Sequence, residues 1–401
     1  MRERQAGDTL STMSTPEIER ELGGILIPRR GNRPMVRGEG CWLWDDQDRR
    51  YLDLTSAHGT APLGHSHPAL VRAISEQAER LIALSSSFFN DSRAAVLAEL
   101  AKHLPQHFAH IFLCNSGTEA VEAALKFATL TTGRSGWVAL KRGFHGRSLG
   151  ALGVTWSTRF RKPFAELLHP TTFVTPNDLD ELERAITAET SAFIAEPVQG
   201  ESGVLPVQAE FLCRAQELCK HHGALFVADE IQTGFGRTGS WFAHTESGIE
   251  PDLMVLAKGI AGGFPMGAVA MSKPVAEALR PGLHGTTFGG GPLASSAAIA
   301  TLQTLAEEDL PAVAGEQGNY LLGELGNAIG DYTLVRELRG RGLMVGIELR
   351  KKVAPFLSQL MEEHNLLALP AGPTVLRLLP ALIVTREQID QAVKAIAAVL
   401  E

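Results

Sequence analysis

The stretch that decides the fold is Asp252-Leu253-Met254-Val255-Leu256-Ala257-Lys258, an apolar run that ends in a lysine and precedes Gly259-Ile260-Ala261-Gly262-Gly263. A second apolar run, Ala224-Leu225-Phe226-Val227-Ala228, ends in Asp229-Glu230. Short apolar runs with glycines and charges at their ends are typical of buried strands. If the two runs are neighbouring strands, Lys258 and Asp229 lie side by side at one edge of a sheet.

A lysine and a carboxylate placed in this way can serve one cofactor. The amine can form a Schiff base with an aldehyde, and the carboxylate can pair with a protonated ring nitrogen. Together these describe pyridoxal phosphate (PLP) chemistry. A lysine at the end of a strand is more often a solvated terminus, so Lys258 alone does not decide the matter.

The alternation of strand and helix patterns predicts an α/β fold with a mostly parallel sheet. Pro34 to Asp53 has the alternation of a hairpin or meander. Strands are predicted at 110–114, 136–141, 191–195, 224–228, 252–257, 342–349 and 374–378, and helices at 119–130, 210–222, after about 294, at 356–363 and at 387–400. We expect a flexible tail (1–20), a large domain (61–293) with a seven-stranded sheet, and a small α+β domain built from both chain ends (21–60 and 294–401).

Composition limits the function classes. The 401 residues are 44% hydrophobic and 20% charged, which suits a folded protein with a sizeable core. The net charge of −8 gives no global basic field, which argues against general nucleic-acid binding. No apolar run reaches membrane-spanning length, and the N-terminus has no apolar core of a signal peptide. Four cysteines without CxxC pairing suit a reducing cytoplasm, so we expect a cytoplasmic protein.

A phosphate site is predicted where Asn115-Ser116-Gly117-Thr118-Glu119 follows the strand ending at Cys114. Ser116 and Glu119 match a capping box, and Gly117 lets the backbone approach an anion at the helix N-terminus. A plain capped helix explains the same residues. The ligand interpretation gains support because Ser116-Gly117-Thr118, Asp229 and Lys258 all follow strands, where open α/β sheets bind ligands.

Three other patterns are weaker evidence for a function. Gly234-Phe235-Gly236-Arg237-Thr238-Gly239 matches G-x-G-x-x-G, but it neither follows a strand directly nor opens a helix, so we interpret it as a turning loop. Gly146-Arg147-Ser148-Leu149-Gly150 matches the G-x-S-x-G nucleophile elbow, yet the glycine-interrupted residues after it do not predict the required helix. His65 and His67 lack a third metal ligand at suitable spacing, so no metal is predicted.

Taken together and in order, the motifs resemble the class III PLP-dependent aminotransferases, most closely the acetylornithine and ornithine aminotransferase branch. The resemblance runs from about Pro34 to the C-terminus, and its segments are specific as a set: 63–68, 114–120, 143–147, 196–201, 229–234, 257–259 and 284–289. Gly153-Val154-Thr155-Trp156 and Leu367–Val375 are similar to aminotransferases of carrier-dependent lysine biosynthesis, whose substrates are attached to the small acidic protein LysW.

The resemblance implies PLP fold type I, a homodimer with shared active sites, and a role for each matching residue. Lys258 would bind PLP as a Schiff base and move a proton, and Asp229 would pair with the ring nitrogen. Gln232 would reach the ring hydroxyl and Phe144 would stack on the ring. Ser116, Gly117 and Thr118 would hold the phosphate, with Thr287 reaching it from the partner subunit. The cofactor site would also include Glu230 and Ile231.

The resemblance places substrate carboxylates on Arg147 and Arg377, whose guanidinium geometry suits them, and adds Thr286 to the substrate site. A glutamate matching Glu201 would pair with Arg377, hiding it from an ω-amine substrate and releasing it for glutamate. A surface ion pair is the alternative interpretation. The sequence departs from the family at Gly291, where Asn is common, in a loop expected near the subunit interface.

The sequence therefore predicts an aminotransferase that exchanges the terminal amine of a lysine- or ornithine-type substrate with 2-oxoglutarate or glutamate, in lysine or arginine biosynthesis. A LysW-linked substrate would suit a basic rim, for which Arg142, Arg159, Arg161 and Lys162 are candidates, although a solvated charged face explains them equally. The alternatives are free N-acetylornithine, ornithine or 4-aminobutyrate as substrate, a nicotinamide oxidoreductase, and a non-catalytic interaction protein.

Overall fold

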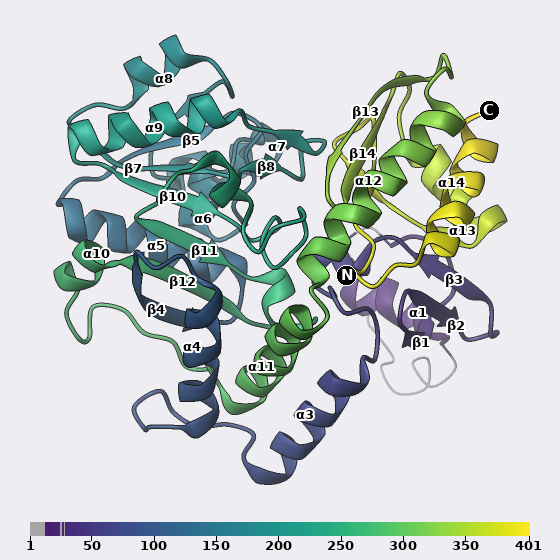
Figure 1. Ribbon diagram of the computed structural model, residues 1–401, viewed down its shortest axis with the longest axis horizontal. Coiled ribbons are helices and arrows are strands. Elements are labelled where there is room, and N and C mark those ends of the chain that lie inside the picture. The colour runs from purple at the N-terminus through teal and green to yellow at the C-terminus, as the bar shows by residue number, and fades with distance from the viewer. Residues whose placement is uncertain (1–12, 25, 28) are drawn as a thin grey trace, which may run out of the picture.

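The computed structural model describes residues 13–24, 26–27 and 29–401. Its larger part is built on a seven-stranded sheet, seen on the left of Figure 1, in the order β4-β12-β11-β10-β7-β5-β6. Only β12 runs antiparallel to its neighbours, β11 and β4. The predicted seven-stranded, mostly parallel sheet is confirmed. Its strands are β4 (Phe108–Cys114), β5 (Gly136–Leu140), β6 (Thr171–Val174), β7 (Thr190–Ala195), β10 (Leu225–Asp229), β11 (Leu253–Leu256) and β12 (Gly267–Ser272).

The central strands are buried on both faces, which explains their continuous apolar runs. Phe226 and Ala228 face one hydrophobic cluster, whereas Leu225 and Val227 face another. The helices of this part are α5 (Gly117–Thr132), α6 (Leu149–Val154), α7 (Thr158–Arg161), α8 (Leu179–Ala185), α9 (Ala209–His222) and α10 (Lys273–Ala278). A short antiparallel pair, β8 (Val198–Gln199) with β9 (Leu205–Pro206), lies after β7.

The strands near the two chain ends form two smaller sheets. The meander β1 (Met35–Glu39), β2 (Trp42–Asp45) and β3 (Arg50–Asp53) gains β15 (Leu366–Leu367) beside β3, which joins the N-terminal segment to the C-terminal one. The second sheet has the order β13-β14-β17-β16, with β13 (Val335–Arg341), β14 (Met344–Leu349), β16 (Leu369–Ala371) and β17 (Val375–Leu378). Helices α12 (Leu310–Ile329), α13 (Ala354–His364) and α14 (Arg386–Leu400) accompany it on the right of Figure 1.

The remaining helices are α1 (Thr15–Ile18), α2 (Ser56–Gly59), α3 (Pro68–Arg80), α4 (Asp91–His103) and α11 (Pro292–Glu307). The predicted helical stretch after residue 294 is two helices, α11 and α12, because Asp309 between them has the left-handed φ of 45°. Of the predicted N-terminal tail, residues 1–12 lie outside the described residues, and the exact domain boundaries stay a prediction. None of the helices in the described part of the chain is long and apolar enough to cross a membrane.

Candidate active site

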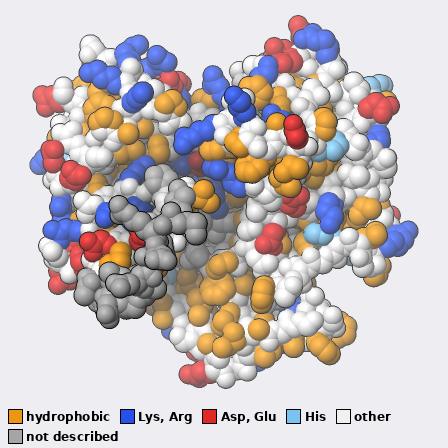
Figure 2. Space-filling view, turned by 180° about the vertical axis from the view of Figure 1, so that it is seen from behind, with side chains coloured by type: hydrophobic (Ala, Val, Ile, Leu, Met, Phe, Trp, Pro, Cys, Tyr) orange, Lys and Arg blue, Asp and Glu red, His pale blue; other side chains and the backbone are white. Residues whose placement is uncertain are grey.

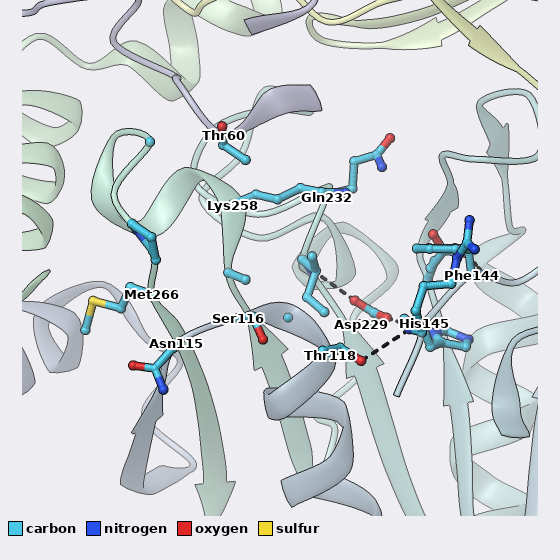
Figure 3. Close-up of a pocket in the computed structure, with 18 of the residues that line it drawn as sticks. Thr60, Asn115, Ser116, Thr118, Phe144, His145, Asp229, Gln232, Lys258 and Met266 are labelled. Atoms are coloured by element: carbon cyan, nitrogen blue, oxygen red, sulfur yellow. Dashed lines mark hydrogen bonds and ion pairs between the residues drawn. The ribbon is translucent and has the colours of Figure 1, made fainter. Parts of the chain in front are cut away.

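Three strand ends meet at one cavity of about 470 Å³. Ser116 follows β4, Asp229 ends β10, and Lys258 follows β11. Strands β10 and β11 are parallel neighbours with Asp229 opposite Val255, so Asp229 and Lys258 lie on adjacent strand ends as predicted. The same cavity is lined by Thr60, Phe144, Arg147, Ile231, Gln232 and Met266, several of which Figure 3 labels.

Lys258 is held in an unusual backbone conformation. Its φ is 44°, in the left-handed region, at the start of a short 3₁₀ turn that ends at Ala261. The backbone of any residue other than glycine is strained in this region, and such strain persists only where the surrounding structure enforces it. Burial lowers the pKa of the Lys258 amine below its ordinary value, while Glu201 acts in the opposite direction. A lowered pKa favours the neutral amine, which is the nucleophilic form.

Asp229 is only 2% exposed and is fixed by two hydrogen bonds. Its Oδ1 accepts from the Ile231 N–H at 3.0 Å, and its Oδ2 lies 2.6 Å from Nδ1 of His145 (Figure 3). The backbone N–H of His145 in turn donates to Oγ1 of buried Thr155 at 2.9 Å. Burial alone lowers the pKa of His145, but the hydrogen bond and charge of Asp229, with Glu196, raise it overall. His145 therefore holds the Asp229 carboxylate in place and supports its negative charge.

Glu196 adds a second buried carboxyl group to this cluster. Its Oε2 accepts from the Phe144 N–H at 3.1 Å, and the residue is 5% exposed. Burial raises the pKa of Glu196 to about 7, although the His145 charge acts against this. The candidate residues chosen from the sequence did not include His145, Thr155 or Glu196. The signal for His145 was its place beside Phe144 in Gly143-Phe144-His145-Gly146.

The N-terminus of α5 lies at one end of the cavity. Oγ of Ser116 caps the helix by accepting from the Glu119 N–H at 3.3 Å. The predicted capping box forms only in part, because Oε2 of Glu119 accepts from the Asn115 N–H at 2.9 Å, one residue before the cap. The N–H groups of the first helical turn have no partner within the helix and favour an anion. At Gly117 a Cβ would lie 2.8 Å from Cδ1 of Ile231, so a larger residue would have to displace the Ile231 side chain.

Thr118 ties this turn to the loop after β5. Its Oγ1 lies 2.6 Å from Oγ of Ser148 and accepts from the Arg147 and Ser148 N–H groups at 3.3 and 3.2 Å. The prediction that no helix follows Ser148 is wrong, because α6 begins at Leu149. Oε1 of Glu122 accepts from the N–H of Gly150 at 2.7 Å and satisfies that helix end, a partner that periodicity does not reveal. Ser148 bonds to Thr118 rather than to a histidine base.

One wall of the cavity is aromatic and cationic. The Arg147 guanidinium lies 3.5 Å from the centre of the Phe160 ring and 5.7 Å from that of Phe144. Arg147 is exposed and reaches the cavity, while Phe144 is half-buried. This position leaves the planar guanidinium facing solvent, where it can bind a carboxylate.

Glu201, Gln232 and Arg377 form a connected cluster beside Lys258. Nη1 of Arg377 donates to Oε1 of Glu201 at 2.6 Å and to Oε1 of Gln232 at 3.0 Å. Arg377 is 1% exposed, and its Nε has no hydrogen-bond partner within the described structure. Burial alone raises the pKa of Glu201, but Arg377 and Lys258 outweigh it and lower that pKa to about 2. The pair is therefore charged, and it is not the exposed ion pair of the alternative interpretation.

Some predicted site residues lie elsewhere in this chain. The carboxylate of Glu230 does not line the cavity, because it accepts from the backbone N–H of His244 at 2.7 Å and from Oγ1 of Thr233. Thr286 and Thr287 line a separate cavity with Asn115, and Thr287 is exposed. The G-x-G-x-x-G segment is a turning loop, as predicted, in which buried Arg237 donates to the Leu343 carbonyl at 2.9 Å.

The residues at the cavity fit PLP. A lysine with a lowered pKa, a buried carboxylate held by His145, and a glycine-lined helix N-terminus supply an amine, a ring-nitrogen partner and a phosphate cradle. The aminotransferase class-III family model matches residues 28–400. The chain belongs to the class-III aminotransferases. It is accordingly a PLP-dependent enzyme that transfers amino groups.

Relatives and solved structures of this family resemble the chain over most of its length. It is 49% identical to the [LysW]-aminoadipate semialdehyde transaminase of Deinococcus radiodurans, over 91% of this chain and 85% of that protein. It is 41% identical to the acetylornithine aminotransferase of Methanopyrus kandleri, over 90% of this chain and 93% of that protein. The crystal structure of acetylornithine aminotransferase from Elizabethkingia anophelis superposes with a TM-score of 0.83 at 31% identity, and the match covers 95% of this chain and 97% of that one.

Proposed function

We propose that this aminotransferase exchanges the terminal amino group of a lysine- or ornithine-type substrate with 2-oxoglutarate, and that the substrate is carried on an acidic carrier protein of the LysW kind. In biosynthesis the flow is reversed, and glutamate aminates the semialdehyde for lysine or arginine. The 49% identity to a [LysW]-aminoadipate semialdehyde transaminase supports the carrier. The observation that carries the reaction type is the Glu201–Arg377 pair beside Lys258.

That pair explains how one site serves two unlike substrates. The terminal amine of the first substrate brings no carboxylate near Arg377, so the guanidinium must be neutralised, and Glu201 at 2.6 Å does this. Glutamate and 2-oxoglutarate bring a second carboxylate, which can replace Glu201 on Arg377. Because Glu201 is 34% exposed while Arg377 is 1% exposed, Glu201 is the partner with room to move.

The other residues take roles that follow from their chemistry. PLP, when bound, supplies the electron-withdrawing ring that makes a neighbouring C–H bond acidic. Lys258 would hold the cofactor and move the proton, and Asp229, positioned by His145, would pair with the ring nitrogen. Phe144, Gln232 and Ile231 would line the ring, and Ser116, Gly117 and Thr118 would bind the phosphate. Arg147, at the cavity wall, binds the substrate carboxylate next to the α-carbon.

Positive charge near the cavity supports an acidic carrier. Lys and Arg side chains gather around the hollow between the two parts of the molecule (Figure 2). Of the four predicted rim residues, Arg142, Arg159 and Lys162 are exposed, whereas Arg161 lies 4.6 Å from the Phe173 ring centre and is half-buried. Exposed cations speed the encounter with an acidic partner, and this effect weakens with salt.

A homodimer completes the proposed site. Thr287 is exposed and lines a different cavity from Lys258 of its own chain, as a residue that serves the partner would. Large apolar side chains nearby in sequence are also exposed, including Leu283 and Phe288, at 46% and 69%. Gly291 is the N-cap of α11 and has an ordinary φ of −61°, so the loop closes without the family's Asn.

A second candidate function is transamination of free N-acetylornithine, which the 41% identical acetylornithine aminotransferase of Methanopyrus kandleri favours. A side-by-side assay separates the two. Turnover is measured with carrier-linked lysine or ornithine, Nα-acetyllysine, N-acetylornithine and free ornithine, each with 2-oxoglutarate. The proposal expects the highest kcat/KM for a carrier-linked substrate. A kcat/KM for free N-acetylornithine as high as any other would establish the second candidate instead.

A further inference from the structure

Glu201 lies in a short loop that packs on the smaller sheet. The loop, residues 200–204, joins β8 to β9 and is here called the Glu201 loop. It meets a row of cross-strand neighbours, in which Arg339 of β13 lies opposite Gly346 of β14, and Gly346 lies opposite Arg377 of β17. Cross-strand neighbours project from the same face of a sheet. The two arginines therefore flank a glycine that has no side chain.

The backbone of the loop occupies the space above that glycine. A Cβ at Gly346 would lie 3.1 Å from the carbonyl oxygen of Gly203 and 3.2 Å from Cβ of Val204. A Cβ at Gly203 would in turn lie 2.9 Å from Nη2 of Arg339 and 3.2 Å from Cγ2 of Val375, on β17. The loop therefore sits directly on the strands that carry the two arginines.

The loop is strained where the chain turns back from Glu201. The φ angle is 121° at Gly203 and 57° at Val204, which is buried. A β-branched residue in the left-handed region is an outlier that persists only where the surrounding structure enforces it. The position of Glu201, three residues before Val204, therefore depends on the contacts that enforce this turn.

Arg339 holds this turn from the smaller sheet. Its Nε donates to the Gly203 carbonyl at 2.7 Å. Its Nη1 pairs with Glu337 at 2.6 Å and with Glu348 at 2.7 Å, and only 9% of its side chain is exposed. The hydrogen bond from Arg339 lowers the pKa of Glu348, so this partner is ionised near pH 7. The two carboxylates fix the planar guanidinium, which keeps its Nε–H directed at the carbonyl.

Two arginines of one row thus hold the Glu201 loop at two points, because Arg377 binds the Glu201 carboxylate and Arg339 binds the Gly203 carbonyl. We infer that Arg339 is a positioning residue for Glu201: it keeps the Glu201 carboxylate on Arg377 and so sets how readily the site exchanges the amine substrate for a dicarboxylate. This inference rests on the proposed function, because it requires Glu201 to leave Arg377 when a second substrate carboxylate arrives. A weaker hold at Gly203 favours the dicarboxylate.

The test compares two ligands that bind without reacting. Glutarate lacks the keto group of 2-oxoglutarate but keeps both carboxylates, whereas pentanoate has one carboxylate and brings no charge to Arg377. Their dissociation constants are measured by calorimetry on the PLP-loaded protein. Arg339→Gln is expected to tighten glutarate binding about fivefold, the size of one net hydrogen bond, and to leave pentanoate binding unchanged.

Two single variants separate the bond to Gly203 from the charge of Arg339. Arg339→Lys keeps a cation beside Glu337 and Glu348, but one ammonium group cannot also reach the Gly203 carbonyl, so most of the effect on glutarate should remain. This variant carries the same test if Arg339→Gln does not fold. Arg336→Gln is the matched control, because Arg336 pairs with Glu348 at 3.0 Å, and its removal leaves the bond between Arg339 and Gly203 in place. It should change neither dissociation constant.

A double variant decides whether Arg339 acts through Glu201. If it does, adding Arg339→Gln to Glu201→Gln should cause no further change in glutarate binding. The same fivefold change in both backgrounds, no change in the wild-type background, or an equal change for pentanoate overturns the inference. If Glu201→Gln itself leaves glutarate binding unchanged, the exchange of carboxylates on Arg377 in the proposed function fails, and the inference fails with it.

Discussion

Replacing Glu201 by glutamine removes the charge that neutralises Arg377 while keeping the size of the side chain. Arg377 and Lys258 lower the pKa of Glu201 from 4.5 to about 2 against the opposing effect of burial. At about 1.4 kcal/mol for each tenfold change in acidity, and discounted by about half because 34% of the side chain is exposed, the contacts that favour the Glu201 carboxylate are together worth roughly 1.7 kcal/mol. If most of this comes from Arg377, the released guanidinium should bind a dicarboxylate up to about 20-fold more tightly.

The assay follows each half-reaction separately. Single-turnover stopped-flow measurements record the absorbance of the bound cofactor after mixing with the ω-amine donor, or after mixing the amino-loaded enzyme with 2-oxoglutarate. Glu201→Gln should lower the apparent dissociation constant for 2-oxoglutarate and raise that for the amine donor, because an uncompensated guanidinium then faces an apolar chain. Opposite changes in the two dissociation constants would show that Glu201 controls whether Arg377 is available to a substrate carboxylate.

Glu181→Gln is the control for this prediction. The pKa of Glu181 is also lowered to about 2, by Lys141 at 2.7 Å, but this pair lines neither the cavity of Lys258 nor the neighbouring cavity of Glu201 and Arg377. Glu181→Gln should therefore leave the dissociation constants of both half-reactions unchanged. If Glu201→Gln weakens both half-reactions equally, or changes neither, Glu201 supports the fold and does not control Arg377.

Four further predictions concern other parts of the site. Lys258→Ala should remove the visible absorbance of the bound cofactor and lower turnover by at least about a thousandfold, measured by spectroscopy and coupled assay, and retention of both would exclude Lys258. Gly117→Ala should weaken PLP binding about tenfold or more, because its Cβ would lie 2.8 Å from Ile231, whereas Gly323→Ala, in open space on a helix, should not; equal PLP dissociation constants would contradict this. His145→Ala should lower the free energy of unfolding more at about pH 6 than at about pH 9. The pKa of His145 is raised in the folded protein, so its protonated form stabilises the fold at low pH, and this stability is lost as the pH rises through that pKa. An equal fall in thermal stability at both pH values would show that His145 acts through packing alone. Mixing Lys258→Ala subunits with Thr287→Ala subunits should restore activity, because one of the two sites in each hybrid dimer would contain both native residues. If the mixture is no more active than Thr287→Ala alone, Thr287 serves the site of its own chain.

The sequence predicted those parts of the site that lie where an apolar run ends. Asp229 and Lys258 could be placed together because each closes a buried strand, and the register of β10 and β11 confirms the pairing. His145 could not be assigned in this way, because its contact with Asp229 joins residues 84 apart. The same holds for the Glu196 bond to the Phe144 N–H, which spans 52 residues.

Local propensity misled where a tertiary contact decided the backbone. Helix α6 forms despite Gly150 and Gly153, because the Glu122 carboxylate of α5 satisfies its first N–H groups. The left-handed turn at Ser56–Gly59 has only one glycine and gave no signal, since its conformation depends on bonds such as that from Ser56 to Leu379. The cavity lined by Glu201 and Arg377 is similarly assembled from distant segments, since Arg30 and Ala368, which also line it, are 338 residues apart.

The most direct test of the account is the ratio of kcat/KM values for one diamino acid presented in two forms, linked to a small acidic carrier protein and as its free Nα-acetyl derivative. Both react through the same terminal amine, so the ratio isolates recognition of the carried group. The expected ratio is about ten or more and falls as salt is added, because exposed cations steer the acidic partner. A ratio near one at every salt concentration would contradict a carrier-linked substrate.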